Sequence, residues 1–367
     1  MRNSIIRPTP PRIVITGLGF VAPSPLAEAL SGRRAAPPRP VPEITAFEVP
    51  DGAPTWGFEV LDFSLDKELP TIKSFVDRTS GLALVAAKAA LADAGLLDRE
   101  KRPAGVEIGC SHGTTLGCLE AMGIFWHKVK TSNPRFAQPV PFTHGYANSP
   151  SSLLCIEYGL RGPAATFSGE RLAGVEALMF AFDQIAAGAG EVILAGASES
   201  LTPAGYNHLL ATGQLSRSGN WDDGIIPGEG AAMLVLESED SARNRGARIH
   251  AEVEGVALYH FDAKSAPVRR NVGTDPRETV LFVSPPSLRA GGAAGPFWSA
   301  DARTFSGDLC TGDMLSASPV LGAALGLCTR AYSAVRVLAR CGETQCATPG
   351  RSRRTAAAHA RRACVAN

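Results

Sequence analysis

The hydrophobic positions of this chain fall into short apolar runs that alternate with longer segments of helical spacing. The runs are bounded by glycine, proline or polar residues, which is typical of buried strands. Strands are predicted at 13–16, 106–109, 164–167, 191–196, 231–236 and 250–258, and helices at 79–94, 116–129 and 172–187. Because strands alternate with helices, the pattern predicts an α/β layered fold.

Local signals refine a few of these elements. Gly17-Leu18-Gly19 predicts a tight turn directly after the first strand. Ser80 is expected to cap the helix at 79–94, and Gly95 to end it. Residues 32–56 are rich in proline and glycine without a clear period, which indicates an irregular surface segment.

Length and composition exclude several classes of protein. The 367 residues are enough for a large buried core, and 45% hydrophobic against 19% charged residues indicates a globular chain. A formal net charge of +1 gives no strong field to attract nucleic acid or an acidic membrane surface. The chain has no apolar run of about 18 residues and no signal-peptide pattern, so we expect neither a membrane span nor secretion.

The eight cysteines are scattered and form no CxxC pair or Cys/His metal spacing. Scattered thiols in a chain of this length suit a reducing compartment, so a cytoplasmic location is predicted. Neither a metal nor a cofactor is predicted.

Residues 331–367 differ in composition from the rest of the chain. From Arg330 onward there are eight arginines, no lysine and one acidic residue, Glu343. Charge runs of one sign are usually solvated, so we expect a basic, disordered tail. An anionic protein partner for this tail is the alternative.

Two short motifs are weighed against simpler explanations. Residues 17–22 match the GxGxxA dinucleotide fingerprint, but Pro23 and Pro25 stand where its helix should begin, so a strand-to-loop turn is preferred. Residues 109–113 match the GxSxG nucleophile elbow, with Ser111 as nucleophile. No motif surrounds the later histidines His208, His250, His260 and His359, so a glycine-rich strand end is preferred there.

Three further histidines, His112, His127 and His144, lack metal-ligand spacing. Each is expected to be a surface or hydrogen-bonded side chain.

Six spaced segments, taken in order over residues 12–260, resemble the β-ketoacyl synthase family. They are RIVITGLG at 12–19, DRTSGLALVAAKAALADAGL at 77–96, YGLRGP at 158–163, EVILAGASE at 191–199, DGIIPGEGAAMLVL at 223–236 and RGARIHAEVE at 245–254. The resemblance implies the thiolase-like αβαβα fold, which is pseudo-duplicated and forms dimers. It divides the chain into an N-terminal half at 12–250, a degenerate C-terminal half at 251–330 and the tail at 331–367.

The family's nucleophilic cysteine corresponds to Arg171 in this chain. Counting forward from Gly162 and back from Gly188 gives the same position. A guanidinium stays protonated and offers only donors, so it cannot attack a thioester. The nearest hydroxyl, Ser168, becomes the nucleophile only if the register slips by three residues.

The family's two histidines and its lysine are also missing. The first histidine corresponds to Ser284 or its neighbour Pro285, the second to Pro319, and the lysine to Met314. In active relatives the two histidines hold the malonyl unit and stabilise the enolate and oxyanion. No histidine lies between Lys264 and Arg351, so no register shift within that half restores one.

Residues 170–178, ERLAGVEAL, resemble the chain length factor subfamily, which carries EQAGGLDAL there. The resemblance implies a non-condensing subunit in fatty acid or polyketide assembly, with acyl carrier protein delivering substrate. The partner would be an active ketosynthase, or a second copy of this chain, and residues 164–167 and 172–187 would lie near the interface. The alternatives are a divergent acyltransferase, a malonyl-binding or decarboxylating enzyme that uses Arg171, and an inert scaffold.

Overall fold

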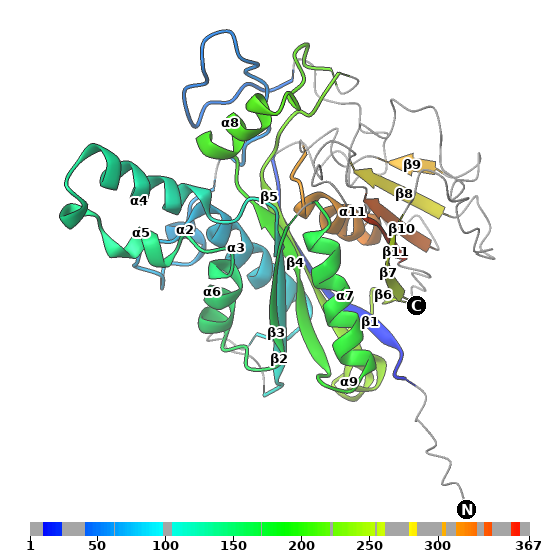
Figure 1. Ribbon diagram of the computed structural model, residues 1–367. Helices are drawn as coiled ribbons and strands as arrows, with labels where there is room; N and C mark the ends of the chain where they lie inside the picture. Colours follow the sequence, from blue (N-terminus) through cyan, green and yellow to red (C-terminus); the bar gives the residue numbers. More distant parts are fainter. Residues whose placement is uncertain are drawn as a thin grey trace, which may run out of the picture.

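The computed structural model describes most of the chain between Pro10 and His359. The described residues are 10–23, 41–61, 63–97, 105–169, 171–220, 223–253, 255–260, 279–284, 303–305, 313–328, 334–339 and 354–359. They form two β-sheets with helices packed between and beside them (Figure 1).

The larger described sheet has six strands in the order β3-β2-β4-β5-β1-β6. β3, β2 and β4 are parallel, whereas β5 and β1 run antiparallel to their neighbours. The strands are β1 (Ile13–Val21), β2 (Ile108–Thr114), β3 (Ala164–Ser168), β4 (Val192–Glu199), β5 (Gly230–Ser238) and β6 (Ala251–Val253). All residues of β2, β4 and β5 are buried, as expected for strands covered on both faces.

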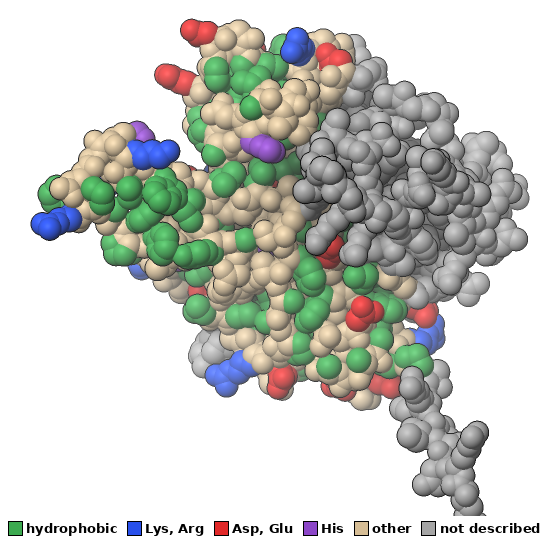
Figure 2. Space-filling model, viewed as in Figure 1, with side chains coloured by type: hydrophobic (Ala, Val, Ile, Leu, Met, Phe, Trp, Pro, Cys, Tyr) green, Lys and Arg blue, Asp and Glu red, His purple; other side chains and the backbone are tan. Residues whose placement is uncertain are grey.

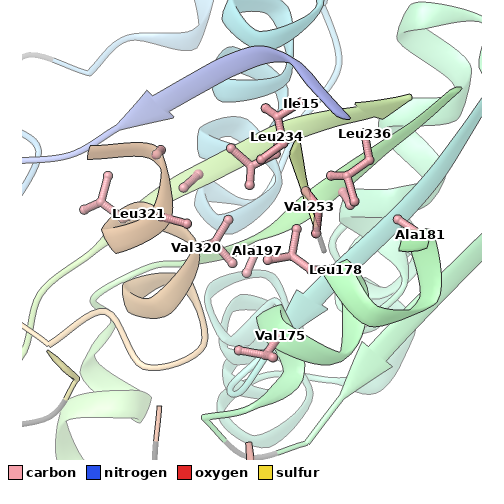
Figure 3. Packing of buried hydrophobic residues seen from close by; sticks show 14 of the residues in the cluster. Ile15, Val175, Leu178, Ala181, Ala197, Leu234, Leu236, Val253, Val320 and Leu321 are labelled. Carbon is pink, nitrogen blue, oxygen red and sulfur yellow. The ribbon is translucent and has the colours of Figure 1, made fainter. Parts of the chain in front are cut away.

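Helices cover both faces of this sheet. α3 (Arg78–Asp93) and α6 (Ser149–Tyr158) pack on one face, and α7 (Ala173–Ala186) and α11 (Ala317–Cys328) pack on the other. The core between the sheet and the second helix pair is apolar; Figure 3 labels Ile15, Val175, Leu178, Ala181, Ala197, Leu234, Leu236, Val253, Val320 and Leu321. Burying each leucine of this set contributes roughly 1.5–3 kcal/mol, so this layer stabilises the packing of the two helices on the sheet.

The second sheet repeats the plan of the first. Its strands are β7 (Gly255–His260), β8 (Thr279–Ser284), β9 (Arg303–Phe305), β10 (Ala334–Ala339) and β11 (Arg354–His359), in the order β7-β11-β10-β8-β9. Within the second sheet, the strands from β9 to β7 are the third, second, fourth, fifth and first in chain order. The strands β3-β2-β4-β5-β1 of the first sheet follow one another in the same order. The pattern of parallel and antiparallel pairs is also the same.

α7 and α11 lie between the two sheets, since each also contacts strands of the second sheet. The described layers are therefore helix, sheet, helix and sheet. This arrangement confirms the predicted pseudo-duplicated α/β layered fold of the thiolase type. A second outer helical layer is not among the described residues.

Part of the segment expected to be a disordered tail is strand. β10 pairs with β8, and β11 pairs with both β10 and β7. The expectation of disorder is wrong for these two stretches, because they supply the fourth and fifth strands that the second repeat needs to complete its sheet. The rest of 331–367 lies outside the described residues, and the three domain boundaries stay a prediction.

A helical arm, defined as residues 119–148, projects from the body of the molecule (Figure 1). It contains α4 (Leu119–Thr131), the 3-10 helix η1 (Pro134–Phe136) and α5 (Pro139–Thr143). The remaining described helices are α2 (Leu65–Glu68), α8 (Pro203–Ala211) and α9 (Glu239–Asn244). No described helix is long and apolar enough to cross a membrane.

β1 does not turn at Gly17-Leu18-Gly19 as predicted but continues to Val21. The two glycines instead let α3 approach the strand, since a Cβ on Gly19 would lie 2.0 Å from the Ala86 carbonyl oxygen. The strand is antiparallel to both neighbours. It therefore does not open the βαβ unit that a dinucleotide site requires.

The start of α3 also differs from the prediction. Asp77, not Ser80, caps the helix, with its carboxylate accepting from the Thr79 N–H at 2.8 Å. Its second oxygen accepts from the Ala121 N–H at 2.9 Å and so fixes the first turn of α4. Gly95 follows the helix with a φ of 66°, as expected for a glycine at a helix end. The strand predicted at 250–258 is split into β6 and β7.

The contact between β1 and α3 predicts a large loss of stability for Gly19→Ala. The new methyl group would overlap the α3 backbone, so we expect a loss of about 3 kcal/mol or more in the free energy of unfolding by urea titration. Gly123→Ala is the matched control, because a Cβ at Gly123 in α4 meets nothing within 4 Å. That variant should gain up to about 1 kcal/mol. Equal stability of the two variants would contradict the close packing.

Candidate functional site

The N-terminal ends of α7 and α11 meet in the middle of the molecule. A Cβ on Gly174 in α7 would lie 2.2 Å from the Ser316 carbonyl oxygen, just before α11. Arg171 stands immediately before the N-cap of α7, Leu172. The loop 313–316 leads into α11 and faces it. The approach is possible only because residue 174 has no side chain.

Arg171 and Asp313 form a buried ion pair across this junction. The Nη1 of Arg171 donates to Oδ2 of Asp313, and the two residues are only 5% and 1% exposed. Oδ1 of Asp313 accepts from the Leu315 N–H at 2.9 Å. Breaking such a pair leaves a buried charge uncompensated, which typically costs about 3–5 kcal/mol.

The backbone around Asp313 is fixed on both sides. Its N–H donates to the Ile226 carbonyl at 2.8 Å, and its carbonyl accepts from the Gly228 N–H at 3.0 Å. Leu315 adopts a left-handed φ of 47°, which costs a non-glycine residue about 1–3 kcal/mol. The structure thus maintains a strained loop that holds the Asp313 carboxylate beside Arg171.

The N-terminus of α7 interacts favourably with the charge of Asp313 and unfavourably with that of Arg171. Unpaired N–H groups and the helix dipole favour an anion near the N-terminus of α7 and disfavour a cation. Arg171 is therefore unfavourable there by itself. Asp313 supplies the anion and neutralises the guanidinium at the same point.

A second buried contact joins the same loop to the first sheet. The Ser316 hydroxyl donates to Glu199 at the end of β4. The Glu199 carboxylate also accepts from the N–H groups of Thr115 and Leu116 and from the Thr114 hydroxyl. Burial raises the pKa of Glu199, whereas these hydrogen bonds oppose that shift. The loop before α11 is thus held by two acidic residues, Asp313 and Glu199.

The structure brings three of the four sequence-predicted site residues to this junction. Met314 is fully buried between Asp313 and Leu315, and Pro319 is buried in the first turn of α11. Neither offers a titratable group. Ser284 is the last residue of β8, and its side chain lies outside the described part of the chain.

The sequence alone did not identify Asp313 as a site residue. The available signal was an acidic residue beside Met314, where the resemblance implies a lysine, together with an arginine at the position expected for the nucleophile. Ser168, the alternative nucleophile, is exposed at the end of β3, whereas Arg171 directly precedes the N-cap of α7.

The GxSxG segment is not a nucleophile elbow. Ser111 is buried within β2, and its hydroxyl donates to the Ala177 carbonyl in α7 at 2.7 Å. Next to it, His112 is buried with its Nε2 2.8 Å from the Ser198 hydroxyl. Burial lowers the pKa of His112 from 6.5 to about 3. The serine-hydrolase alternative is therefore wrong, and His112 is a neutral, hydrogen-bonded core residue as expected.

The other histidines are dispersed. His127 is exposed on the arm, and His208 is exposed on α8. Within the described ranges no three His, Cys, Asp or Glu residues lie close enough together to hold a metal ion.

Comparison with known proteins shows what the chain resembles. The family model of the β-ketoacyl synthase N-terminal domain matches residues 11–242. A putative polyketide β-ketoacyl synthase 1 of Streptomyces cyaneus is 32% identical over 275 residues, covering 68% of this chain and 63% of the relative. The tetracenomycin polyketide synthase ketoacyl synthase beta subunit of Streptomyces glaucescens is 33% identical, covering 70% and 65%. The matches thus span less than two thirds of these relatives.

Solved structures support the fold. The ishigamide ketosynthase/chain length factor superposes with a TM-score of 0.70 at 24% identity, covering 86% of both chains. A type II polyketide acyl-carrier protein in complex with its ketosynthase gives a TM-score of 0.66 at 19% identity, covering 95% of this chain and 98% of the other.

The ion pair predicts strong coupling between Arg171 and Asp313. Asp313→Asn keeps the acceptor for Leu315 but leaves the guanidinium unpaired, so we expect a loss of about 3–5 kcal/mol in the free energy of unfolding. Arg171→Met should cost a similar amount. The double variant should recover most of the loss, because no buried charge remains.

An exposed pair is the matched control for that cycle. Arg243 of α9 is 67% exposed and pairs with Glu239 one helical turn away. Arg243→Met should cost less than about 1 kcal/mol. Additive losses at Arg171 and Asp313 would show that the two side chains do not depend on each other.

The lowered pKa of His112 predicts a dependence of stability on pH. The unfolded chain binds a proton below pH 6.5, whereas the folded chain does not until about pH 3. Stability is therefore complete above pH 6.5 and falls by about 1.4 kcal/mol for each pH unit below it. His112→Gln should reduce the loss measured by urea titration between pH 6.5 and 5 by about 2 kcal/mol. His208→Gln, at an exposed position, should leave the loss of stability between pH 6.5 and 5 unchanged.

Proposed function

The chain belongs to the β-ketoacyl synthase family, and from that premise we propose that it is a non-condensing subunit of the chain length factor type. It pairs with an active ketosynthase in the assembly of a polyketide or fatty acid chain on acyl carrier protein.

The observation that carries this proposal is the buried, ion-paired Arg171 at the nucleophile position. Condensation requires a thiolate that first accepts the acyl group and then releases it to the enolate. Arg171 cannot form an acyl-enzyme, and its guanidinium is already bonded to Asp313. The helpers are absent as well, since Pro319 has no side-chain donor or base and Met314 has no charge.

The two buried free cysteines, Cys110 and Cys118, offer no substitute nucleophile. A hydrogen bond to Cys155 and burial raise the pKa of Cys110 in β2. Burial also raises the pKa of Cys118 at the start of α4. A thiol with a raised pKa stays protonated and unreactive.

Two surfaces support the role of a partner subunit. β3 lies at the edge of its sheet, bonded to β2 on one side, and open strand edges are ready to pair with another chain. The arm is covered little by the rest of the subunit, since Ala121 is the one buried residue of α4. Its exposed large hydrophobic residues are Ile124, Trp126, Phe136, Val140, Phe142 and Tyr146. Figure 2 shows hydrophobic side chains gathered on the arm.

The relatives favour the same role. The Streptomyces glaucescens protein is described as a ketoacyl synthase beta subunit, and the ishigamide structure as a ketosynthase/chain length factor. The chain length factor subfamily has glutamine where this chain has Arg171. Both side chains lack a nucleophile, so the departure is consistent with a subunit that does not condense.

A second candidate function keeps Arg171 active as a binding group. Its Nη2 is buried and has no hydrogen-bond partner among the described residues. A guanidinium nitrogen in that state can donate to the carboxylate of a malonyl group. The chain would then bind or decarboxylate malonyl carrier protein.

Pairing is tested by co-expression with a ketosynthase whose gene lies near the gene of this chain. We expect a stable complex by size-exclusion chromatography and a changed product length when this chain is deleted. Trp126→Asp and Phe136→Asp, at positions 49% and 69% exposed, should weaken co-purification without unfolding the subunit. Arg243→Glu on α9 is the matched surface control. Failure to co-purify, together with unchanged products on deletion, would refute the proposal.

The second candidate is tested with the purified chain alone. Incubation with malonyl carrier protein should yield acetyl carrier protein if Arg171 supports decarboxylation, and Arg171→Met should abolish that product. No product from the wild-type chain argues for the non-catalytic role. A chain without a cooperative unfolding transition, alone or with its partner, would indicate an inert scaffold.

A further inference from the structure

Cys110 in β2 and Cys155 in α6 are two free cysteines on the face of the first sheet that α3 and α6 cover. Cys110 is fully buried in the core on that face, and Cys155 is half-buried and packs against the same core. Neither residue belongs to the arm or to the junction of Arg171 and Asp313. The proposed function gives neither thiol a role.

The alternation of side chains along β2 determines which face Cys110 lies on. The Ser111 hydroxyl donates to the Ala177 carbonyl at 2.7 Å, so Ser111 points toward α7. Successive side chains of a strand point to opposite faces, so Cys110 points away from α7 and toward α6. The core around Cys110 on that face includes Leu154 of α6, the neighbour of Cys155.

The packing of α6 on the sheet brings Cys155 to the level of Cys110. The Ser151 hydroxyl of α6 lies 2.6 Å from the Thr166 hydroxyl of β3. Cys155 is on the same face of the helix, one turn or about 6 Å further on. Because β3 returns from the end of α6, that step corresponds to two residues back along the strand, about 6.6 Å, at Ala164. Ala164 is the β3 residue paired with Cys110 in β2.

The loop between α6 and β3 holds this arrangement. Its Gly162 N–H donates to the Ile108 carbonyl at 3.0 Å, and its Pro163 carbonyl accepts from the Cys110 N–H at 2.9 Å. The chain is thus bonded to β2 at Cys110 itself, a few residues after α6 ends. This short connection fixes the last turn of α6 beside Cys110.

The two thiols differ in chemical character. A hydrogen bond from the Cys110 thiol lowers the pKa of Cys155, and burial opposes that shift. The same hydrogen bond, together with burial, raises the pKa of Cys110. A partly accessible thiol with a lowered pKa beside a second thiol is the arrangement typical of redox-sensing cysteines.

We propose that Cys155 is a site of reversible oxidation by hydroperoxides, with Cys110 as its resolving thiol. The Cys155 thiolate attacks one oxygen of the hydroperoxide. An S–O bond forms, the O–O bond breaks, and the leaving oxygen takes a proton from solvent. Cys155 becomes a sulfenic acid, and the hydroperoxide is reduced to water or an alcohol.

Cys110 then attacks the sulfenic sulfur of Cys155. An S–S bond forms, the S–O bond breaks, and hydroxide leaves as water with the proton of Cys110. The two thiols have together given two electrons to the hydroperoxide, and an external dithiol returns them by thiol–disulfide exchange. The cross-link joins α6 to β2, and its formation requires neither Arg171 nor a partner subunit.

The test treats the fully reduced full chain with hydrogen peroxide, blocks the remaining thiols with N-ethylmaleimide and digests the chain with trypsin without reduction. Cys110 lies in the tryptic peptide 102–128 and Cys155 in the peptide 136–161. We expect mass spectrometry to find these two peptides joined by a disulfide, and dithiothreitol to separate them. Cys155 left unmodified, oxidised without a link, or linked to any other cysteine would overturn the proposal.

Cys118 provides the matched control, because it lies in the same tryptic peptide as Cys110 but at the start of α4. Cys118→Ser should leave the link unchanged. Cys110→Ala should abolish the link and leave a Cys155 sulfenic acid that dimedone traps. Cys155→Ser, at a half-buried position, should abolish both signals, and it tests the proposal if the Cys110 variant does not fold. A link that is lost in Cys118→Ser or kept in Cys110→Ala would refute the pairing.

The rate of alkylation gives a second readout that does not involve peroxide. In the reduced chain at neutral pH, iodoacetamide should modify Cys155 at least about tenfold faster than Cys118, because burial raises the pKa of Cys118. Cys110→Ala should slow the reaction of Cys155, since it removes the hydrogen bond that stabilises the thiolate. Equal rates at Cys155 and Cys118 would contradict the proposed attack by Cys155.

Discussion

The buried ion pair between Arg171 and Asp313 is the interaction on which the centre of this molecule depends. It joins the N-terminal ends of α7 and α11, one from each repeat, in the layer between the two sheets. Two helix ends that meet there concentrate unpaired N–H groups and positive potential. An arginine in the same place is tolerable only with a carboxylate beside it. The position of Asp313, and the strained loop that holds it, follow from that requirement.

Close backbone approach is the second constraint, and glycine meets it in each case. Gly174 lets the start of α7 meet Ser316, and Gly19 lets α3 lie against β1. These contacts keep the layers near enough for the apolar core to close around them. The ion pair would not form if a side chain at residue 174 held the two helices apart. Packing and electrostatics at the junction therefore depend on the same few positions.

The sequence predicted the buried strands and the helices around Arg171 well, because their periodicity is local and strong. The prediction failed where the local structure is determined by a contact between residues far apart in the sequence. The glycines of β1 carry the same local signal as a turn, and only the approach of α3 distinguishes the two. β11, with the sequence RTAAAH, has a weak strand signal and is a strand through pairing with β7 and β10. Asp313 was missed for a similar reason, since its partner is 142 residues away in the chain.

The charges at the junction are the reverse of those that the family resemblance implies for an active ketosynthase. The family resemblance places a thiolate before α7 and a lysine in the loop before α11; here the cation precedes α7 and the anion lies in the loop. Restoring a cysteine at residue 171 alone would set it beside the Asp313 carboxylate. A neighbouring negative charge raises the pKa of a thiol and keeps it protonated, against the effect of the helix end. Condensing chemistry would thus require Asp313 to change together with Arg171. Arg171 and Asp313 therefore act as one unit at this junction.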